Sequence, residues 1–250
     1  MKKAIFYTIA DENNLPYAKG LEASFKKFHK NIPFKIYGPE YCAKAKEEDN
    51  DFFYKATPWI ARELLEEYEL VVKMDADSVV CGNLDHIIKD ETYGVGVVSN
   101  YSKSDLQLYG AVAVWDIKPE EYFNCGLVAM RDKNFVNNWF RLCQSDRFRN
   151  YRYREQDLLN ILCHYGDYKV KLLDNSELLN GLLGKDLWHA SELENKNIVV
   201  KFRADDGAEV AQRTIKVIHW GGGNASNKMA FETKFTTEVA EYLRELTKYE

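Results

Sequence analysis

The sequence lacks several features that would assign it to a class at once. No stretch approaches the roughly 18 apolar residues of a membrane-spanning helix, and Asp11 and Glu12 interrupt the N-terminal apolar run too early for a signal peptide. There is no long basic block, and the net charge is -5, so we expect no nucleic-acid partner. Neither Gly-x-Gly-x-x-Gly nor an ATPase-type phosphate loop is present, which argues against both of those nucleotide folds.

Cysteine is also scarce. The five cysteines are an odd number, and no two of them form a Cys-x-x-Cys pair. This pattern predicts reduced, mostly buried thiols and argues against a disulfide framework or a zinc site. Because no membrane span is expected either, we predict a soluble, cytoplasmic protein of bacterial or viral origin, or a form separated from its anchor.

What the chain does contain is enough apolar material for a full core. Of its 250 residues, 46% are hydrophobic and 29% are charged, which are ordinary values for a globular protein. This length suits one large α/β domain or two small ones. The 16 tyrosines, 13 phenylalanines and five tryptophans offer aromatic faces of the kind that sugars bind, although most are expected in the core.

The stretch Leu70–Asp85 organises the rest of the chain. Its apolar run, Leu70 to Met74, predicts a strand buried on both faces of an α/β sheet, and Asp75-Ala76-Asp77 follows directly. Two carboxylates at the exit of such a strand need a compensating charge, and their hard oxygens suit Mg²⁺ or Mn²⁺. Ligands of open α/β sheets also collect at the carboxyl ends of strands. The alternative is a pair of turn aspartates that cap the next element.

The other segments complete an α/β pattern. The chain opens with a predicted strand at Ala4–Ala10, a helix at Leu15–His29 and a second strand at Phe34–Tyr37. We expect Cys42–Asp51 to be irregular, and Thr57-Pro58 to open a helix that continues to Tyr68. Further strands are expected at Tyr93–Ser99, Ala111–Trp115, Tyr122–Met130, Lys169–Leu173 and Ile198–Phe202, and further helices at Phe135–Cys143 and Phe235–Tyr249.

Three later segments combine polar residues that are useful in a binding site. In Phe123-Asn124-Cys125-Gly126, the glycine permits close approach and the asparagine supplies a donor and an acceptor, although a bulge with a turn asparagine is an alternative. Glu155-Gln156-Asp157 opens a helix, where acidic residues also stabilise the N-terminus. His219 leaves an apolar strand into three glycines, so it is placed to ligate a metal while the glycine amides cradle phosphate.

Taken in order, these motifs resemble nucleotide-sugar glycosyltransferases with the GT-A fold, and in particular glycosyltransferase family 8, the type of glycogenin and the lipopolysaccharide galactosyltransferases. The resemblance extends from Ile5 to Lys228. It implies an α/β fold of the GT-A, Rossmann-like type, with a central mixed, mostly parallel sheet flanked by helices. We expect one domain over residues 1–250: a nucleotide-binding half (1–100) ending at the Asp-x-Asp motif, an acceptor and catalytic half (101–230) and a C-terminal helix (231–250).

The resemblance also implies a role for each matching residue. Asp75, Asp77 and His219 would hold Mn²⁺ or Mg²⁺. Asn124 would face the sugar or acceptor, and the catalytic segment would be Glu155, Gln156 and Asp157, with Gln156 beneath the anomeric carbon and Asp157 ordering the site. The nucleotide-sugar donor would be bound by Thr8, Asp11, Asn13, Lys55, Ala76, Gly222 and Lys228, of which Lys228 comes three residues later than the family spacing.

The reaction implied is transfer of a hexose from a nucleoside diphosphate sugar, UDP-glucose or UDP-galactose, to a glycan or other hydroxyl acceptor with retention. An amide orients and stabilises positive sugar charge but is a poor base, which suits Gln156. If Glu155 faces the sugar instead, it would act as a base or as a nucleophile.

Less specific interpretations remain for the donor-side residues. Asp11 to Asn14 would simply cap the following helix, and Lys55 would be a solvated surface lysine. A group of four arginines would form a solvated face with ion pairs instead of binding phosphate: Arg147, Arg149, Arg152 and Arg154.

Two other functions remain open for the whole chain. Met74–Val80 also resembles the first motif of haloacid-dehalogenase-type phosphatases, in which the first aspartate is a phosphorylated nucleophile, although that motif usually begins the chain. The other is a non-catalytic nucleotide- or carbohydrate-binding protein with a degenerate site, against which the intact Asp75, Asp77 and His219 argue.

Overall fold

The computed structural model describes residues 2–99, 115–118, 121–173, 178–180, 191–203, 209–219 and 235–248. The strand expected at Ala111–Trp115 therefore lies almost wholly outside the described residues, as do the candidate donor-binding residues Gly222 and Lys228.

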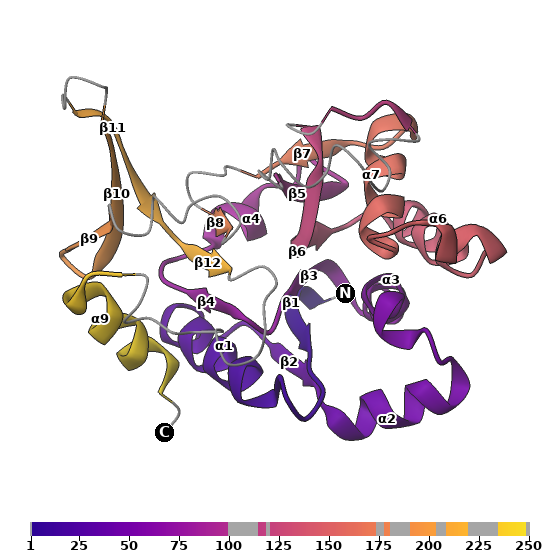
Figure 1. The fold of residues 1–250 in the computed structure, drawn as a ribbon, viewed down its shortest axis with the longest axis horizontal. Helices are drawn as coiled ribbons and strands as arrows, with labels where there is room; N and C mark the ends of the chain where they lie inside the picture. The colour runs from indigo at the N-terminus through magenta and orange to yellow at the C-terminus, as the bar shows by residue number, and fades with distance from the viewer. Residues whose placement is uncertain are drawn as a thin grey trace.

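A six-stranded sheet forms the centre of the molecule, in the order β2-β1-β3-β6-β5-β7 (Figure 1). Neighbouring strands are parallel except around β6, which runs antiparallel to both β3 and β5. The prediction of a central mixed, mostly parallel sheet is thus confirmed. The strands are β1 (Lys2–Ile9), β2 (Phe34–Tyr37), β3 (Tyr68–Met74), β5 (Val95–Ser99), β6 (Phe123–Met130) and β7 (Val170–Leu172).

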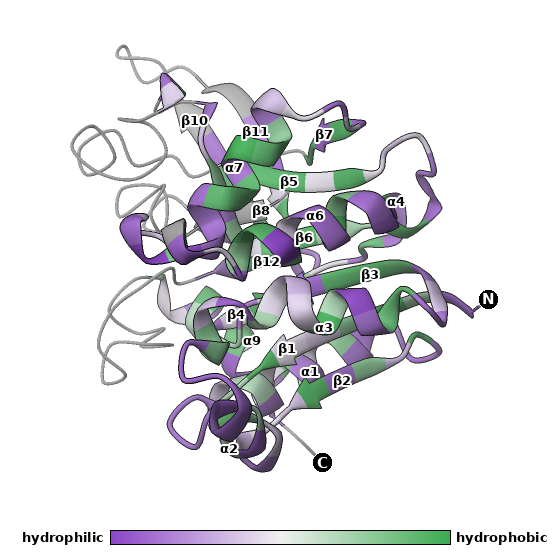
Figure 2. Ribbon diagram, turned by 90° about the vertical axis from the view of Figure 1, so that its right-hand side faces the viewer, coloured by the Kyte–Doolittle hydropathy of each residue, from purple (hydrophilic) through white to green (hydrophobic). Residues whose placement is uncertain are grey.

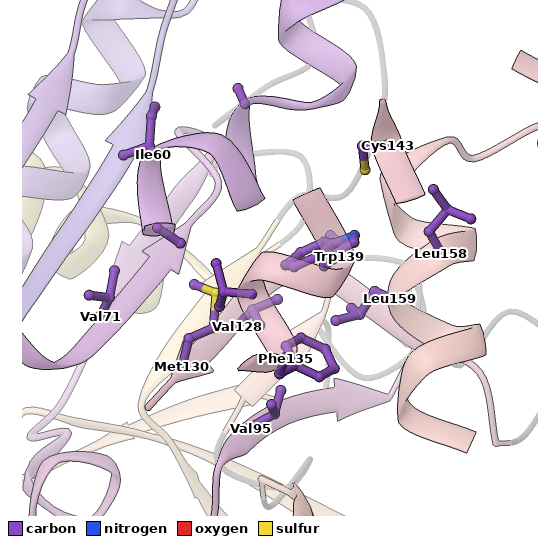
Figure 3. Close-up of a cluster of buried hydrophobic side chains, with 14 of the residues drawn as sticks. Ile60, Val71, Val95, Val128, Met130, Phe135, Trp139, Cys143, Leu158 and Leu159 are labelled. Carbon is purple, nitrogen blue, oxygen red and sulfur yellow. The ribbon is translucent and has the colours of Figure 1, made fainter. Parts of the chain in front are cut away.

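Helices cover both faces of this sheet, as the buried apolar run of β3 requires. Val71 belongs to a core cluster on the face covered by α3, α6 and α7, where Phe135 and Trp139 are fully buried (Figure 3). The alternate residues Leu70 and Val72 belong to a second cluster, which they share with the side chains of α1. The helices are α1 (Leu15–Phe28), α2 (Pro39–Glu48), α3 (Ala56–Leu64), α4 (Asp85–Lys89), α6 (Lys133–Cys143), α7 (Glu155–Tyr165) and α9 (Thr237–Thr247).

Two smaller sheets complete the fold. The antiparallel strands β9 (Ser191–Glu194), β10 (Asn197–Arg203) and β11 (Glu209–Ile215) form one of them, at the end of the molecule where α9 lies (Figure 1). The other joins β4 (Ser78–Val80) to β12 (Val217–His219) and β12 to β8 (Leu178–Asn180). Apolar residues of β4, β10, β12 and α9 form a third core cluster, and Figure 2 shows the apolar residues along the strands of the central sheet.

Two expectations about local structure are wrong. Most of Cys42–Asp51 belongs to α2, which begins at Gly38-Pro39. The alanines, lysines and glutamates that follow have high helix propensity, and the side chains of Cys42 and Ala45 are buried. The helix expected to reach Tyr68 ends at Leu64, since Tyr68 is already in β3 and pairs with Lys2 of β1. Strand pairing outweighs the helical tendency of the segment.

The cysteine prediction is confirmed: all five are free, and only Cys163 is more than slightly exposed. Within the described parts of the chain, every helix is too short or too polar to cross a membrane.

Candidate metal and sugar-nucleotide site

The site forms where β3 ends at the centre of the sheet. Asp75 follows the last residue of β3, and its N–H donates to the Gly126 carbonyl of β6 at 2.8 Å. A tight turn then leads into β4, with the Ser78 N–H donating to the Asp75 carbonyl at 3.1 Å. The turn places the side chains of Asp75 and Asp77 beside one another at the carboxyl end of β3, where the sequence predicts them.

His219 reaches these aspartates through strand pairing. β12 runs antiparallel to β4, and His219 lies opposite Ser78 in the register. Its Nε2 is 3.1 Å from Asp75 Oδ2 and 3.4 Å from Asp77 Oδ1. One ligand atom from each of the three residues lies within 4.8 Å of the others. The three residues predicted to hold a metal are therefore brought together.

The chemistry of this cluster fits a divalent cation. Two carboxylate oxygens and one imidazole nitrogen are a ligand set that Mn²⁺ and Mg²⁺ accept. Asp77 and His219 are buried, and the partly exposed Asp75 brings a second carboxylate beside them, so the two negative charges need a compensating positive charge. His219 Nδ1 is buried without a hydrogen-bond partner among the described residues, so packing and the two carboxylates position the imidazole.

The electrostatics of the cluster show how strongly its members interact. Burial disfavours the charged imidazole, but hydrogen bonds with Asp75 and Asp77 outweigh it and raise the pKa of His219 to about 9. Burial likewise opposes the ionisation of Asp75, yet Lys73 and His219 together hold its pKa well below its usual range. Without a metal, the proton on His219 and the charge of Lys73 compensate the two carboxylates.

Gly126 provides the space that His219 occupies. A Cβ atom at this position would lie 2.6 Å from Asn124 Oδ1 and closer still to the imidazole ring. The sequence predicts that this glycine lets a group approach the backbone, and the group in the structure is the side chain of His219. Only a residue without a side chain fits here.

The strand β6 is irregular at this point. Val97 of β5 pairs with Val128, but Val98 pairs with Asn124, so the register shifts and residues 125–127 bulge from the β5–β6 ladder. Asn124 is buried, and its Oδ1 accepts a hydrogen bond from the Gly126 N–H at 2.6 Å. The segment is thus a bulge with a turn asparagine, and it lies against the cluster of Asp75, Asp77 and His219.

The start of α7 lies next to this bulge. Gln156 Oε1 accepts a hydrogen bond from the Cys125 N–H at 2.9 Å, which fixes the orientation of its amide. Glu155 is half-buried, and burial raises the pKa of its carboxyl to about 8. Arg154, just before the helix, has a φ of 48°, a left-handed conformation that is uncommon for a residue with a side chain. The backbone is therefore strained where the candidate catalytic segment begins.

Asp157 points away from solvent and orders this segment. Its side chain is fully buried, with Oδ1 accepting from the Tyr122 hydroxyl and Oδ2 accepting from the Tyr153 N–H at 2.9 Å. These two hydrogen bonds hold the start of α7 against Tyr122 and against the segment that contains Tyr153.

On the donor side, the loop after β1 serves first as a helix start. Asp11 Oδ1 accepts hydrogen bonds from the N–H and the side-chain amide of Asn14, at 3.0 and 2.7 Å, and so stabilises the turn that leads into α1, although no side chain caps the helix itself. Asn13 is exposed. Thr8 and Ala76 are buried, and the Thr8 hydroxyl has no hydrogen-bond partner among the described residues. Within the described part of the chain, Thr8 is thus an unsatisfied polar group near the end of β1.

Lys55 and the arginines form a separate polar cluster. Lys55 is 8% exposed, and its Nζ is 2.7 Å from Asp49 Oδ2 and lies over the Phe148 ring. It is therefore not a solvated surface lysine. Arg149 pairs with Asp51 at 2.7 Å, and Arg154 binds backbone carbonyls of the segment that precedes it. These contacts tie the segment before α7 to the segment before α3.

Sequence reasoning missed two residues of the site. Lys73, in β3, donates hydrogen bonds to Asp75 and to the Cys125 carbonyl. Asn160, in α7, binds the N–H and C=O of Phe123 at 2.6 and 2.9 Å and so anchors the helix to β6. A charged residue inside the apolar run Leu70–Met74 was the available signal for Lys73, because a lysine in such a strand needs a partner.

The fold and this cluster define the class of structure: the chain has the fold of GT-A glycosyltransferases. One similar structure is the galactosyltransferase LgtC in complex with donor and acceptor sugar analogues, with a TM-score of 0.61 and 16% identity over 97% of this chain and 95% of that one. An LgtC active-site mutant with glutamate in place of glutamine has a TM-score of 0.59 and 16% identity, over 97% and 94% of the two chains.

A third similar structure is the bifunctional glycosyltransferase WbbM, with a TM-score of 0.62 and 17% identity. The match covers 99% of this chain but 50% of WbbM, so this chain corresponds to about half of that protein. No protein-family model matches the sequence, and neither does any curated protein. At these identities, the similarity establishes the fold.

Proposed function

We propose that the protein is a metal-dependent glycosyltransferase that moves a hexose from a nucleoside diphosphate sugar to a hydroxyl acceptor. The observation that carries the proposal is the cluster of Asp75, Asp77 and His219 at the carboxyl end of β3. On an α/β sheet this is where ligands bind, and the fold is shared with glycosyltransferases.

Asp75, Asp77 and His219 would hold Mn²⁺ or Mg²⁺. The bound cation would act as a Lewis acid that neutralises the diphosphate when it departs. The side chains keep the three ligand atoms on one side of the strand ends, since β3 and β6 fix the backbone of Asp75 and β4 fixes that of His219. This preorganisation lowers the cost of binding both the cation and the diphosphate.

The donor would bind across the ends of β1 and β3. Thr8 supplies a buried hydroxyl without a described partner at the end of β1, and Ala76 packs in a small apolar cluster with Ala10 and Ala18. Asp11 and Asn13, in the loop after β1, would contact the base and ribose. Lys55 would bind the diphosphate only if the donor displaced the contact between Lys55 and Asp49. Gly222 and Lys228 complete the proposed donor set.

The sugar would face Asn124 and Gln156. The amide of Gln156 is oriented by the Cys125 N–H, next to the glycine against which His219 packs. An amide in that place stabilises positive charge on the sugar without attacking it, which suits transfer with retention, and Glu155 is the alternative nucleophile or base. LgtC, a galactosyltransferase with a glutamine in its active site, supports the role of Gln156 and galactose as one candidate sugar. The proposed donor is UDP-galactose or UDP-glucose.

The proposal is tested by calorimetric titration of UDP into the purified protein, first with Mn²⁺ and then with EDTA, and again on Asp77→Ala. We expect binding that requires the metal and is weakened about 100-fold or more in the variant, because a metal ligand is lost. Asp167→Asn, which changes an exposed aspartate outside the cluster, is the matched control and should bind like the wild type. Positive binding would then justify a screen of UDP-hexoses for hydrolysis.

The outcome that overturns the proposal is absence of binding to UDP, GDP or any other nucleoside diphosphate with Mn²⁺ present. Release of phosphate from a phosphomonoester, lost in Asp75→Asn, would instead favour the phosphatase alternative. Binding without any turnover, over a full screen of nucleotide sugars and acceptors, would favour the binding protein.

A further inference from the structure

Lys73 is an unusual residue for the centre of a sheet. It lies in β3, between Tyr7 of β1 and Val128 of β6, and its residue surface is 6% exposed. Lysine is almost never buried to this extent unless its charge is paired. Most neighbouring core positions of β3 are apolar, so the ammonium group needs a specific partner.

The partner is one oxygen of a candidate metal ligand. Lys73 Nζ donates hydrogen bonds to Asp75 Oδ1 and, at 2.8 Å, to the Cys125 carbonyl. The other oxygen of the same carboxylate, Asp75 Oδ2, is the one 3.1 Å from His219 Nε2. Residues two apart in an extended chain point to the same side, which lets Lys73 reach the carboxylate of Asp75. Its ammonium and the imidazole of His219 therefore contact different oxygens of one carboxylate.

The charges of this arrangement can be counted in the state that binds a metal, in which His219 has lost its proton. Asp75 and Asp77 contribute two negative charges and Lys73 one positive charge, so the group then carries -1, and a divalent cation brings it to +1. Without Lys73, the corresponding totals would be -2 and 0. The lysine thus makes the group less attractive to a bare cation and more attractive to an anion once the cation is bound.

We propose that Lys73 is a positioning residue with two effects. Its hydrogen bond to Asp75 Oδ1 keeps that oxygen from binding the cation, so that Oδ2 is the oxygen that binds. Its charge leaves the metal-loaded site with a net positive charge that attracts a diphosphate. The diphosphate part rests on the proposed function. The cation part does not, because it concerns only Lys73 and the three clustered side chains. A lysine that merely supported the fold would have no effect of this kind on two ligands of opposite charge.

The test measures Mn²⁺ and UDP binding separately on Lys73→Met and Lys73→Gln. The first variant removes the charge and the hydrogen bonds, and the second keeps a donor without the charge. Electron paramagnetic resonance measures the binding of Mn²⁺ alone, which we expect to be about threefold to tenfold tighter in both variants. UDP at saturating Mn²⁺ should bind both variants about tenfold more weakly. Both changes follow from the loss of one nearby positive charge. Lys133→Met, which removes an exposed lysine paired with Glu66, is the control and should leave both affinities unchanged.

Opposite changes in the two affinities support the proposal. Mn²⁺ affinity that falls, or stays the same, in a variant whose thermal unfolding shows it to be folded overturns the role of Lys73. If the wild type binds Mn²⁺ but no nucleoside diphosphate, the proposed function fails, and the Mn²⁺ measurement alone still decides the role of Lys73. If Lys73→Met does not fold, Lys73→Gln gives the same decision, because its amide can still bind Asp75 and Cys125.

Discussion

Gly126 illustrates how one residue sets the geometry of the site. The hydrogen atom that stands where a Cβ would be faces the His219 imidazole, and the Gly126 carbonyl accepts a hydrogen bond from the Asp75 N–H. Gly126 therefore contacts two of the three candidate metal ligands: it packs against the His219 imidazole, and its backbone is hydrogen-bonded to that of Asp75. A methyl group added here cannot be accommodated by a small movement, because β12 holds the backbone of His219 against β4.

We expect Gly126→Ala to lower Mn²⁺ affinity by about tenfold or more, because the imidazole is displaced from the two carboxylates. The free energy of unfolding should fall by about 1–3 kcal/mol, the usual cost of overpacking. Titration with Mn²⁺ and chemical denaturation check the two effects. Gly38→Ala is the matched control, since no atom lies within 4 Å of a Cβ at that position, and it should change neither. Wild-type Mn²⁺ affinity in Gly126→Ala would show that His219 does not bind the metal.

At the scale of elements, the start of α7 is held in place by buried polar contacts. Asp157 joins it to Tyr122 and Tyr153, and Asn160 joins it to the backbone of Phe123. These contacts fix Gln156 relative to β6. The acidic residues also lie where the N-terminal end of a helix favours negative charge.

We expect Asp157→Asn to cost about 1–3 kcal/mol of unfolding free energy, because its amide cannot accept from both Tyr122 and the Tyr153 N–H, and a buried donor is left unpaired. Loss of Gln156 orientation should lower kcat more than it raises KM for the donor. Thermal unfolding and steady-state kinetics measure these changes.

A double-mutant cycle with Tyr122→Phe isolates the bond between the two side chains. The double variant should cost clearly less than the sum of the single variants, because both remove the same contact. Strictly additive effects would show that the hydroxyl and carboxylate do not interact in solution.

At the scale of the whole molecule, the main sheet, the smaller sheets and the helices share three core clusters. His29 follows the last residue of α1, its ring lies against Phe6 and Phe25 of the second cluster, and its Nε2 accepts a hydrogen bond from the Leu84 N–H at 2.9 Å. Burial lowers the pKa of His29, and Asp85, 3.8 Å from its Nδ1, partly opposes this. The folded protein therefore takes up this proton less readily than the unfolded chain.

The sign of the pH dependence follows from this difference. As the pH falls through the usual histidine pKa of about 6.5, the unfolded chain gains the proton first, so the contribution of His29 to stability is present at higher pH and is lost below. We expect the wild type to lose on the order of 1 kcal/mol between pH 7.5 and pH 5 from this bond. His29→Gln keeps an acceptor and should flatten that loss, whereas Asp85→Asn should steepen it. Denaturant unfolding at several pH values measures the effect, and identical pH profiles in all three proteins would contradict it.

Much of the fold follows from local sequence patterns. The apolar run of β3, the amphipathic spacing of α1 and α6, and the strand at Phe34–Tyr37 each specify their own structure. By contrast, α2 was missed because its signals are helix propensity and two small buried residues, not a strong apolar face. The sheet of β9, β10 and β11 was only partly expected, since it depends on pairing between strands and on the cover supplied by α9.

The sequence by itself determined which residue types stand at the end of β3, at the bulge of β6 and at the start of α7, because strand, turn and helix signals act over a few residues. Only the tertiary structure decided that His219 meets Asp75 and Asp77, that the ring of His219 fills the space above Gly126, and that Lys73 holds one oxygen of Asp75. These contacts join segments that are distant along the chain. Their geometry depends on the register of β12 against β4 and of β6 against β3, which no local pattern specifies.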